Sequence, residues 1–287
     1  EPARPDSPSE RTLEAGETKN LASVLADDPL RAVQGLPGVT SNDDFDSRFS
    51  LRGAAYHRIG LYLDDVLLHA PFHMVAGEPA SGSLTIFNGD LLDSLVLHTG
   101  AFPARYGDRT AGALEVRTRD GSRLRPAARV TASASNAGVL AEGPLRRGAW
   151  LVAARKSYLQ YLLRRVSSDP SLAFGFVDVQ GRLSYDLTAR HHLTLSAVDG
   201  RSDLDRSRGR SRLGSNAPMT GEYHFTLSNL AWRYAPSDRF LLTQRAAWLR
   251  ERYDNRNRDE LELAGGYYGE WIWQSSASWV RRGRDPM

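Results

Sequence analysis

The stretch from residue 177 to residue 187 constrains the fold of this chain most strongly, because its side chains alternate strictly between apolar and polar. One face carries Val177, Val179, Gly181, Leu183, Tyr185 and Leu187, and the other carries Asp178, Gln180, Arg182, Ser184 and Asp186. A period of two is typical of a β-strand with one oily and one polar face. In a soluble sandwich the oily face meets the core, whereas in a membrane barrel it meets lipid and the polar face lines a wet lumen. The alternation alone is compatible with both classes.

Connection lengths help to separate these two classes. From residue 127 onward the pattern predicts about eight strands, at 127–135, 138–145, 149–158, 174–187, 191–199, 221–234, 239–251 and 265–281. Short turns are expected near 145–148, 188–191 and 235–238, and long polar connections at 159–172, 201–219 and 253–261, with one tight connection near 136–138 as the exception. Outer-membrane barrels join their strands by short periplasmic turns and longer extracellular loops. We therefore expect the apolar face of 177–187 to meet lipid, and Asp178, Gln180 and Arg182 to face the lumen.

The composition excludes several other classes of protein. No run of about 18 apolar residues occurs, which excludes a membrane-spanning helix but not a barrel of short strands. There is no cysteine, and therefore no disulfide or thiolate chemistry. The formal net charge of +3 is too small to predict nucleic-acid binding. The sequence also lacks GxSxG, phosphate-loop and HExxH motifs, so we expect neither an enzyme nor a cofactor.

Aromatic residues mark a domain boundary near residue 127, because all six tryptophans and eight of the eleven tyrosines lie beyond it. Residues 1–19 are polar and contain proline, and we expect them to form a flexible lead-in. Residues 20–121 are expected to form a small mixed α/β domain, followed by antiparallel strands over 127–287.

Within the small domain, a helix is expected to begin with Asn20 as its N-cap, to continue after Pro29 and to stop at Gly35. Short β-type runs lie at 48–52, 59–63, 95–99 and 113–118.

Four motifs in this small domain resemble the plug of the TonB-dependent outer-membrane receptors. They are PLRAVQGLPGV (29–39), SRFSLRG (47–53), IGLYLDDV (59–66) and GAFPARYGDRTAGALEVRTRDG (100–121). Arg52 and Gly53 match the family's hydrophobic-Arg-Gly signature, and Asp65 stands where the family usually has glycine. The last motif matches through Gly100, Tyr106, Gly107, Gly112, Thr118 and Arg119. Glycines suit a plug because it must turn tightly and pack backbone closely against backbone.

The resemblance implies a plug domain at 20–121 and a barrel of about 22 strands, of which this chain holds the first eight. Eight strands alone would enclose only their own side chains, so we expect the chain to be part of a longer receptor. The implied function is energy-coupled uptake of a scarce extracellular ligand, in the outer membrane of a Gram-negative bacterium. The implied partners are the TonB complex, whose contact segment is not recognisable in this chain, outer-membrane lipid and an unknown small ligand. The alternatives are a soluble or surface all-β binding or adhesion module with an α/β cap, and a signalling receptor of the same family.

The resemblance also implies a lock between plug and barrel, in which Arg52 meets carboxylates on the barrel interior. Glu142, Glu222 and Glu270 are candidate partners, with carboxylates beyond Met287 as the alternative. The plainer interpretation is that Arg52 only lines a wet cavity. A second plug arginine often precedes the glycine that here is Gly100, and this chain has Thr99 at that position.

Apical plug loops face the extracellular ligand in this family, and segments 54–58 and 69–83 are candidates for them. Their candidate ligand-facing residues are Tyr56, His57, Arg58, His69, Phe72 and His73.

Four other groups of residues have plain interpretations. His69 and His73 have a metal-like spacing, but Pro71 spoils a regular helix between them. Asp43, Asp44 and Asp46 lack the calcium-loop pattern and are expected to form a solvated turn, and the arginines between 201 and 212 are expected to lie in an extracellular loop. The spaced aromatics Tyr267, Trp271, Trp273 and Trp279 suit the interfacial girdle of a barrel better than a sugar-stacking platform.

Overall fold

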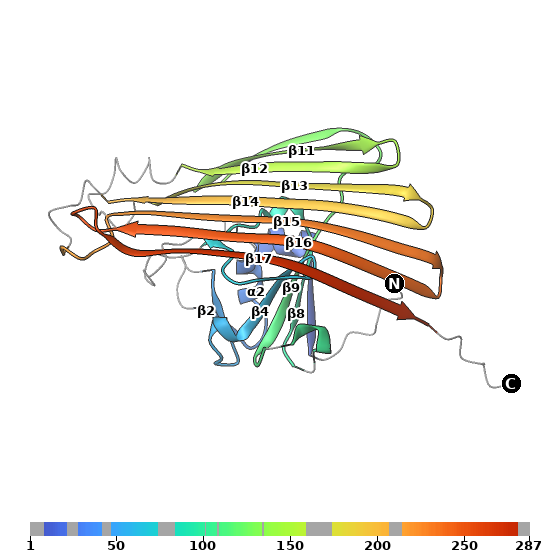
Figure 1. Ribbon diagram of the computed structural model, residues 1–287, viewed down its shortest axis with the longest axis horizontal. Coiled ribbons are helices and arrows are strands. Elements are labelled where there is room, and N and C mark those ends of the chain that lie inside the picture. Colours follow the sequence, from blue (N-terminus) through green and yellow to red (C-terminus); the bar gives the residue numbers. More distant parts are fainter. Residues whose placement is uncertain are drawn as a thin grey trace.

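The computed structural model describes residues 9–21, 28–41, 47–73, 84–100, 102–107, 109–133, 135–158, 174–206 and 214–280. They form a small mixed α/β domain and a sheet of eight antiparallel strands, and the domain lies against one face of the sheet (Figure 1). No helix among the described residues is long and apolar enough to cross a membrane.

The small domain is built on a five-stranded mixed sheet in the order β1-β8-β9-β4-β5. Its strands are β1 (Glu10–Glu14), β4 (Ile59–Leu63), β5 (Val66–Leu68), β8 (Leu92–His98) and β9 (Gly112–Thr118). β9 runs parallel to β4, and the other neighbouring pairs are antiparallel. The domain also contains two small antiparallel pairs and two short helices: β2 (Val39–Ser41) with β3 (Phe49–Leu51), β6 (Phe72–His73) with β7 (Leu84–Thr85), α1 (Ala15–Leu21) and α2 (Leu30–Gln34).

The local sequence explains these boundaries. α2 starts directly after Pro29, which suits a helix N-terminus, and it ends at Gly35, as expected. The four expected strands of this domain are confirmed within three residues at either end. β9 begins with a glycine for steric reasons, because a Cβ on Gly112 would lie 2.5 Å from the His98 carbonyl oxygen and 2.6 Å from Leu51 Cδ2.

The expectation of a flexible lead-in at 1–19 is wrong for residues 10–19. Residues Glu10 to Glu14 pair with β8, in register from Glu10–His98 to Glu14–Ser94, and α1 follows directly. Leu13 is the one large apolar side chain of β1, and it is buried. Composition underestimates this segment because an existing sheet edge supplies the backbone partners that a polar strand needs. The same correction applies to Asn20, which lies near the end of α1 and not at its beginning.

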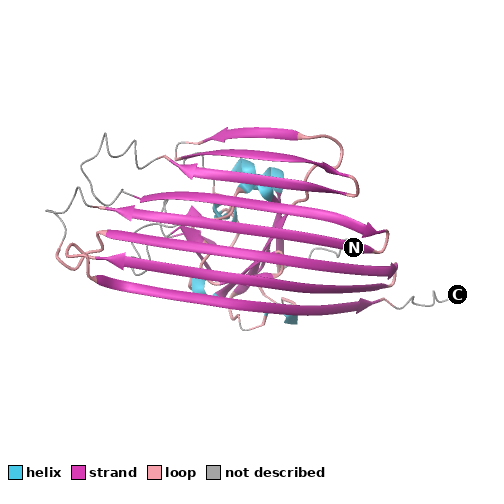
Figure 2. Ribbon diagram, turned by 45° about the horizontal axis from the view of Figure 1, so that its top comes forward, coloured by secondary structure: helices cyan, strands magenta, loops and turns pink. Residues whose placement is uncertain are grey.

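The eight-stranded sheet confirms the expected number of barrel strands. They are β10 (Ala127–Ala132), β11 (Asn136–Leu145), β12 (Gly148–Ser157), β13 (Phe174–Thr188), β14 (His191–Asp205), β15 (Thr220–Ser237), β16 (Phe240–Arg256) and β17 (Glu262–Trp279). Each strand pairs with the next in the sequence, and the sheet is not closed, since β10 and β17 form its two edges. The two-residue turns 146–147, 189–190 and 238–239 lie at the same end of the sheet as the end of β17 (Figures 1 and 2).

β14 and β16 extend further than expected, to Asp205 and Arg256. The expected loops 201–219 and 253–261 therefore start later, while the expected loop 159–172 lies outside the described residues. The extensions carry polar side chains on their outer face, such as the exposed Arg201 and Asp203 on β14 and Arg252 on β16. Strand pairing continues there although the apolar alternation ends, so the sequence pattern underestimates the strand length.

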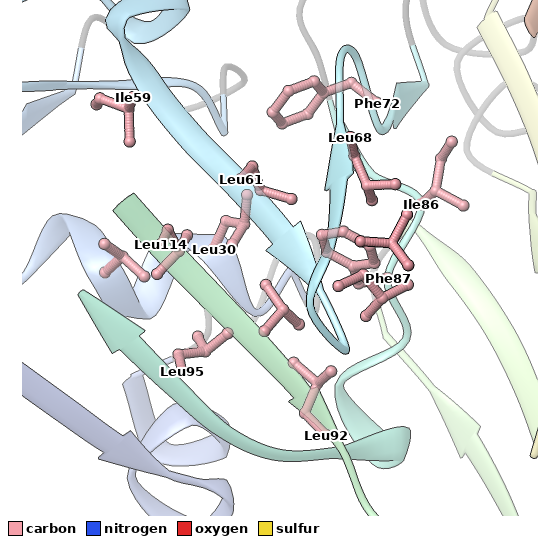
Figure 3. Close-up of a cluster of buried hydrophobic side chains, with 14 of the residues drawn as sticks. Leu30, Ile59, Leu61, Leu68, Phe72, Ile86, Phe87, Leu92, Leu95 and Leu114 are labelled. Atoms are coloured by element: carbon pink, nitrogen blue, oxygen red, sulfur yellow. The ribbon is translucent and has the colours of Figure 1, made fainter. Parts of the chain in front are cut away.

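The two faces of the sheet differ as the alternation predicted. On β13, Val179 and Leu183 are 48% and 37% exposed, whereas Asp178 and Gln180 are 1% and 4% exposed and point toward the small domain. The inner face also contributes Phe225, Leu227 and Leu249 to the apolar core of the small domain. Figure 3 shows part of this core, where Leu30, Leu61, Phe72, Ile86, Phe87 and Leu114 pack together. Burying each such side chain contributes about 1.5–3 kcal/mol, so the shared core fastens the domain to the sheet.

Candidate functional site

The turn between β4 and β5 carries two carboxylates that face arginines of the barrel. Asp64 accepts hydrogen bonds from the Thr118 amide (3.0 Å) and the Thr118 hydroxyl (2.6 Å), and its Oδ2 lies 2.9 Å from Arg182 Nη1 on β13. Burial raises the pKa of Asp64 above its ordinary value, against the opposing effects of Arg182 and Thr118. The contact gives Thr118, a residue of the family signature, a positioning role.

The contacts of Asp65 explain why this chain has aspartate where the family usually has glycine. Its Oδ2 lies 2.8 Å from Arg245 Nη2 on β16, and its backbone carbonyl accepts a hydrogen bond from Gln274 (3.3 Å). Both turn residues have a left-handed backbone, with φ of 45° at Asp64 and 66° at Asp65. Glycine would adopt this conformation more easily, but it could not contact Arg245.

A second contact joins the end of the plug to the barrel. Arg119 donates to both carboxylate oxygens of Glu142 on β11, at 2.6 Å and 3.3 Å, and to the Asp90 carbonyl at 2.9 Å. Arg129 on β10 lies 2.9 Å from Oδ1 of Asp90. Arg119 therefore has the kind of partner that the resemblance implied for Arg52.

Arg52 lies in a different environment. Its Nη2 donates to Thr99 Oγ1 (3.2 Å), which in turn donates to the Ser9 carbonyl (3.2 Å). Thr99 thus occupies the place of the usual second arginine and links Arg52 to the start of β1. None of the three expected carboxylates contacts Arg52 in the part of the chain that the structure describes: Glu142 binds Arg119, Glu222 is exposed on the outer face, and Glu270 accepts a hydrogen bond from Tyr268. A lock through Arg52 and a carboxylate stays a prediction.

Tyr106 of the signature lies inside the plug and organises a buried carboxylate. Its hydroxyl donates to Glu115 Oε2 (2.8 Å), and Arg117 Nε donates to Glu115 Oε1 (3.0 Å). Burial raises the pKa of Glu115, but the hydrogen bonds and charge of Arg117, with those of Tyr106 and Arg105, outweigh this and hold it below its ordinary value. Burial and the neighbouring Glu115 raise the pKa of Tyr106, so its hydroxyl stays protonated.

Three further glycines of the signature differ in their surroundings. Gly53 has a φ of 79°, which explains why glycine follows Arg52, while Gly100 has Arg52 Nη1 as its nearest neighbour, 3.8 Å from an added Cβ. Gly107 follows Tyr106 at the end of a short 3-10 turn.

The candidate ligand-facing residues divide into two groups. His57, Arg58 and His69 are exposed, and the ring of His69 meets that of Tyr268 edge-on at 5.0 Å. Tyr56 is half-buried, with its ring packed between those of Phe49 and Phe72. Phe72 and His73 are buried against the barrel, and ligand contact at these two residues stays a prediction. Pro71, which precedes them in the chain, is apolar and buried as well, so this stretch packs into the core.

A cavity of about 1920 Å³ lies between the plug sheet and the short-turn end of the barrel. On the plug side it is lined by His98, Arg105, Glu115 and Arg117, and on the barrel side by residues that include Arg147, Asp186 and Arg233. Its walls carry charges of both signs.

Four weaker expectations have separate outcomes. Asp43, Asp44 and Asp46 lie outside the described residues, as do Arg208, Arg210 and Arg212. Within the described ranges, no group of three or more His, Asp and Glu side chains could hold a metal ion. Tyr267, Trp271, Trp273 and Trp279 are exposed at alternate positions of β17, on the outer face, as a girdle requires.

The sequence analysis missed the barrel arginines and the plug carboxylates that meet at this interface. The signal that could have found them is the alternation, because it already placed Arg182 and Asp178 on the inner face. A charged side chain at an inward position, opposite a buried plug, needs a partner on that plug.

Comparisons with known proteins support one family. Residues 9–114 match the profile of the TonB-dependent Receptor Plug Domain. A search of curated proteins gave no match.

Solved structures with a similar fold cover nearly the whole chain. They include a variant of the ferric enterobactin receptor of Pseudomonas aeruginosa, with a TM-score of 0.61 and 14% identity over 94% of this chain and 45% of that one. The ferric yersiniabactin uptake receptor of Yersinia pestis has a TM-score of 0.61 and 15% identity over 96% and 46% of the two chains. A copper transporter has a TM-score of 0.62 and 12% identity over 96% and 44%. This chain thus spans about half the length of these proteins. It carries a TonB-dependent receptor plug domain, joined to eight antiparallel strands with the fold of the barrel part of the TonB-dependent receptors.

Proposed function

We propose that the chain is part of an outer-membrane receptor that takes up a small extracellular ligand with energy delivered through TonB. One observation carries the proposal: a plug domain lies against one face of the sheet, while the opposite face carries exposed apolar side chains. On the outer face, Val139, Val152, Leu195 and Leu230 are exposed. A surface of this kind is stable in lipid and costly in water.

Aromatic side chains on the outer face support the same orientation. The rings of His191, Trp232 and Tyr234 stack near the short turns, with ring centroids of His191 and Tyr234 4.5 Å apart. Trp248 and Trp271 meet further along the same face, 6.1 Å apart. Aromatic belts at the two interfaces are typical of membrane barrels. A soluble adhesion module would instead present a polar outer face.

The ligand class is proposed from the names of proteins with a similar fold. One is named as a receptor for ferric enterobactin, one as an uptake receptor for ferric yersiniabactin and one as a copper transporter. A metal chelate is therefore the first class to test, and the exposed His57, Arg58 and His69 are the proposed contacts on the plug.

The proposal is tested with the full-length gene product in a Gram-negative host. We expect the protein in the outer-membrane fraction, with an electrophoretic mobility that changes on heating. Uptake of at least one chelate from a panel of iron-55 siderophores and copper chelates should exceed that of a deletion strain, and it should stop after deletion of tonB or addition of a protonophore. A protein recovered in the soluble periplasmic fraction would contradict the proposal, as would uptake that persists without TonB.

A further inference from the structure

One segment of the plug is attached to the barrel wall differently from all the contacts described above. It comprises residues 70–73 and 84–87, which include β6 and β7, and we call it the docked segment. At its centre, His73 Nε2 lies 2.6 Å from Oδ1 of Asp178 on β13, and His73 Nδ1 lies 2.8 Å from the hydroxyl oxygen of Ser202 on β14. Arg155 on β12 holds the other carboxylate oxygen of Asp178, at 2.9 Å from Nε and 2.7 Å from Nη2.

This cluster is sealed from water. The side chains of His73, Asp178 and Arg155 are 0%, 1% and 3% exposed. The ring of Phe176 closes it, stacked on His73 at 4.4 Å and lying under the Arg155 guanidinium at 5.0 Å. Three barrel strands thus hold one plug histidine in a site where the charges are neither screened by salt nor hydrated.

The barrel also holds the backbone of the docked segment. Arg155 Nη2 donates to the Thr85 carbonyl (2.7 Å), Gln180 Nε2 to the Ile86 carbonyl (2.5 Å) and the Tyr223 hydroxyl to the Ala70 carbonyl (2.8 Å). The Thr85 and Ile86 carbonyls are thus bonded to the wall, while the Ala70 carbonyl also accepts from the Phe72 amide within the segment (2.8 Å). The wall therefore supplies part of the backbone hydrogen bonding of the docked segment.

On the plug side, the docked segment is fastened through a buried aspartate. Asp28 Oδ2 accepts from the Thr85 amide (2.7 Å) and the Ser47 hydroxyl (2.6 Å), and its Oδ1 accepts from the Thr85 hydroxyl and the Leu30 amide, both at 2.9 Å. Thr85 thus binds the start of α2 through Asp28 and the barrel through Arg155.

The plug sheet contacts the wall through ion pairs that are less buried. The two side chains are 42% and 11% exposed in the Asp65–Arg245 pair, 29% and 15% in the Arg119–Glu142 pair, and 13% and 16% in the Asp64–Arg182 pair. Ion pairs that solvent reaches in this way weaken more in salt than the sealed cluster does. The two parts of the plug consequently differ in what releases them from the barrel.

We propose that the docked segment is the last part of the plug to leave the barrel wall, so that the plug sheet can move away while residues 70–73 and 84–87 stay in place. Given the proposed uptake function, a path for the ligand would then open beside the sheet and not beside the docked segment. The ordering itself is a property of the folded protein and is tested without ligand or energy source.

The test is amide hydrogen exchange, followed by mass spectrometry, on the full-length receptor in detergent with sub-denaturing urea. Peptides covering 84–87 should exchange at least tenfold more slowly than peptides covering 92–98 and 112–118. Raising NaCl from 0.05 M to 1 M should speed exchange in the sheet peptides only. Equal rates in both regions, or a docked segment that opens first, would overturn the proposal.

Two matched variants separate the two attachments. Asp178→Asn should raise the exchange of 84–87 at least tenfold and leave 112–118 unchanged, and Asp64→Asn should do the reverse. If Asp178→Asn prevents folding because it strands the Arg155 charge, the double variant Arg155→Met with Asp178→Leu removes both charges and should fold, with the same rise at 84–87. Variants that change both regions together would show that the plug leaves the wall as one unit.

Discussion

At the scale of single residues, the β4–β5 turn combines a strained backbone conformation with long-range contacts to the barrel. Asp64 and Asp65 both have positive φ, where a residue with a Cβ is less stable than glycine by roughly 1–2 kcal/mol. The carboxylates placed in this way reach arginines on β13 and β16. The two opposing effects can be separated by substitution.

We expect Asp65→Gly to leave the thermal unfolding midpoint of the full-length receptor unchanged or higher at 1 M NaCl, because glycine relieves the backbone strain. At 0.05 M NaCl the gain should shrink, because the wild type then has its Asp65–Arg245 pair, a half-exposed pair that contributes about 0.2–1 kcal/mol. Calorimetry at the two salt concentrations measures both effects.

Asp65→Asn is the control, since asparagine tolerates positive φ but carries no charge. Its thermal unfolding midpoint should lose the salt-dependent stabilisation of the wild type and should not show the increase expected for glycine. If wild type and Asp65→Asn respond equally to salt, the pair with Arg245 does not stabilise the plug.

Glu115 makes the plug sensitive to acid. Because its folded pKa lies below the ordinary value of 4.5, its contribution to stability is complete above about pH 4.5 and is lost as the pH falls through the folded pKa. We expect the urea midpoint of the plug to fall below pH 4.5 in the wild type and to be flatter with pH in Glu115→Gln. A variant whose acid sensitivity equals that of the wild type would assign the loss to other carboxylates.

At the scale of elements, the alternation of side chains gives each barrel strand an outer face and an inner face with different surroundings. Leu183 lies on the outer face of β13, while its neighbours Arg182 and Ser184 lie on the inner face. Leu183→Arg should destabilise the full-length receptor by about 2–4 kcal/mol if the position lies near the bilayer midplane. Reversible unfolding from lipid vesicles measures this.

Leu183→Ala is the matched variant, because it removes apolar contact without adding a charge, and it should cost less than Leu183→Arg. Equal stability of the arginine variant and the wild type would place residue 183 away from lipid.

The sequence predicted the barrel strands well because alternation is a local signal. All eight strands appear, and the errors at β14 and β16 fall where the outer face becomes polar. β1 was missed for the opposite reason: its partner β8 lies some eighty residues away, and nothing in Glu10 to Glu14 itself marks a strand. The family motifs located Tyr106, Thr118 and Arg119 but not their partners. Contacts such as Asp65 with Arg245 depend on how two separately folded parts meet, and local patterns carry no record of that.

At the scale of the whole molecule, the sheet has two unpaired edges. β10 and β17 each have one neighbour, and their remaining backbone groups have no partner within the sheet. Lipid cannot satisfy such groups, and in water exposed edges pair with other chains. We expect the 287-residue chain, expressed alone, to aggregate. Size-exclusion chromatography in detergent measures this, and a monodisperse species that also migrates differently after heating would contradict it.

The position of β1 at the edge of the plug sheet has a mechanical consequence. Five residue pairs join it to β8, from Glu10–His98 to Glu14–Ser94. A load applied to the chain ahead of Glu10 and directed across the strands opens these pairs in succession, like a zipper, at low force. The same load directed along the strand axis shears all five pairs at once and meets a much higher threshold. The direction of the load at residue 9 therefore decides the outcome. Either β1 detaches from β8 at low force, or β1 transmits the load to the plug sheet.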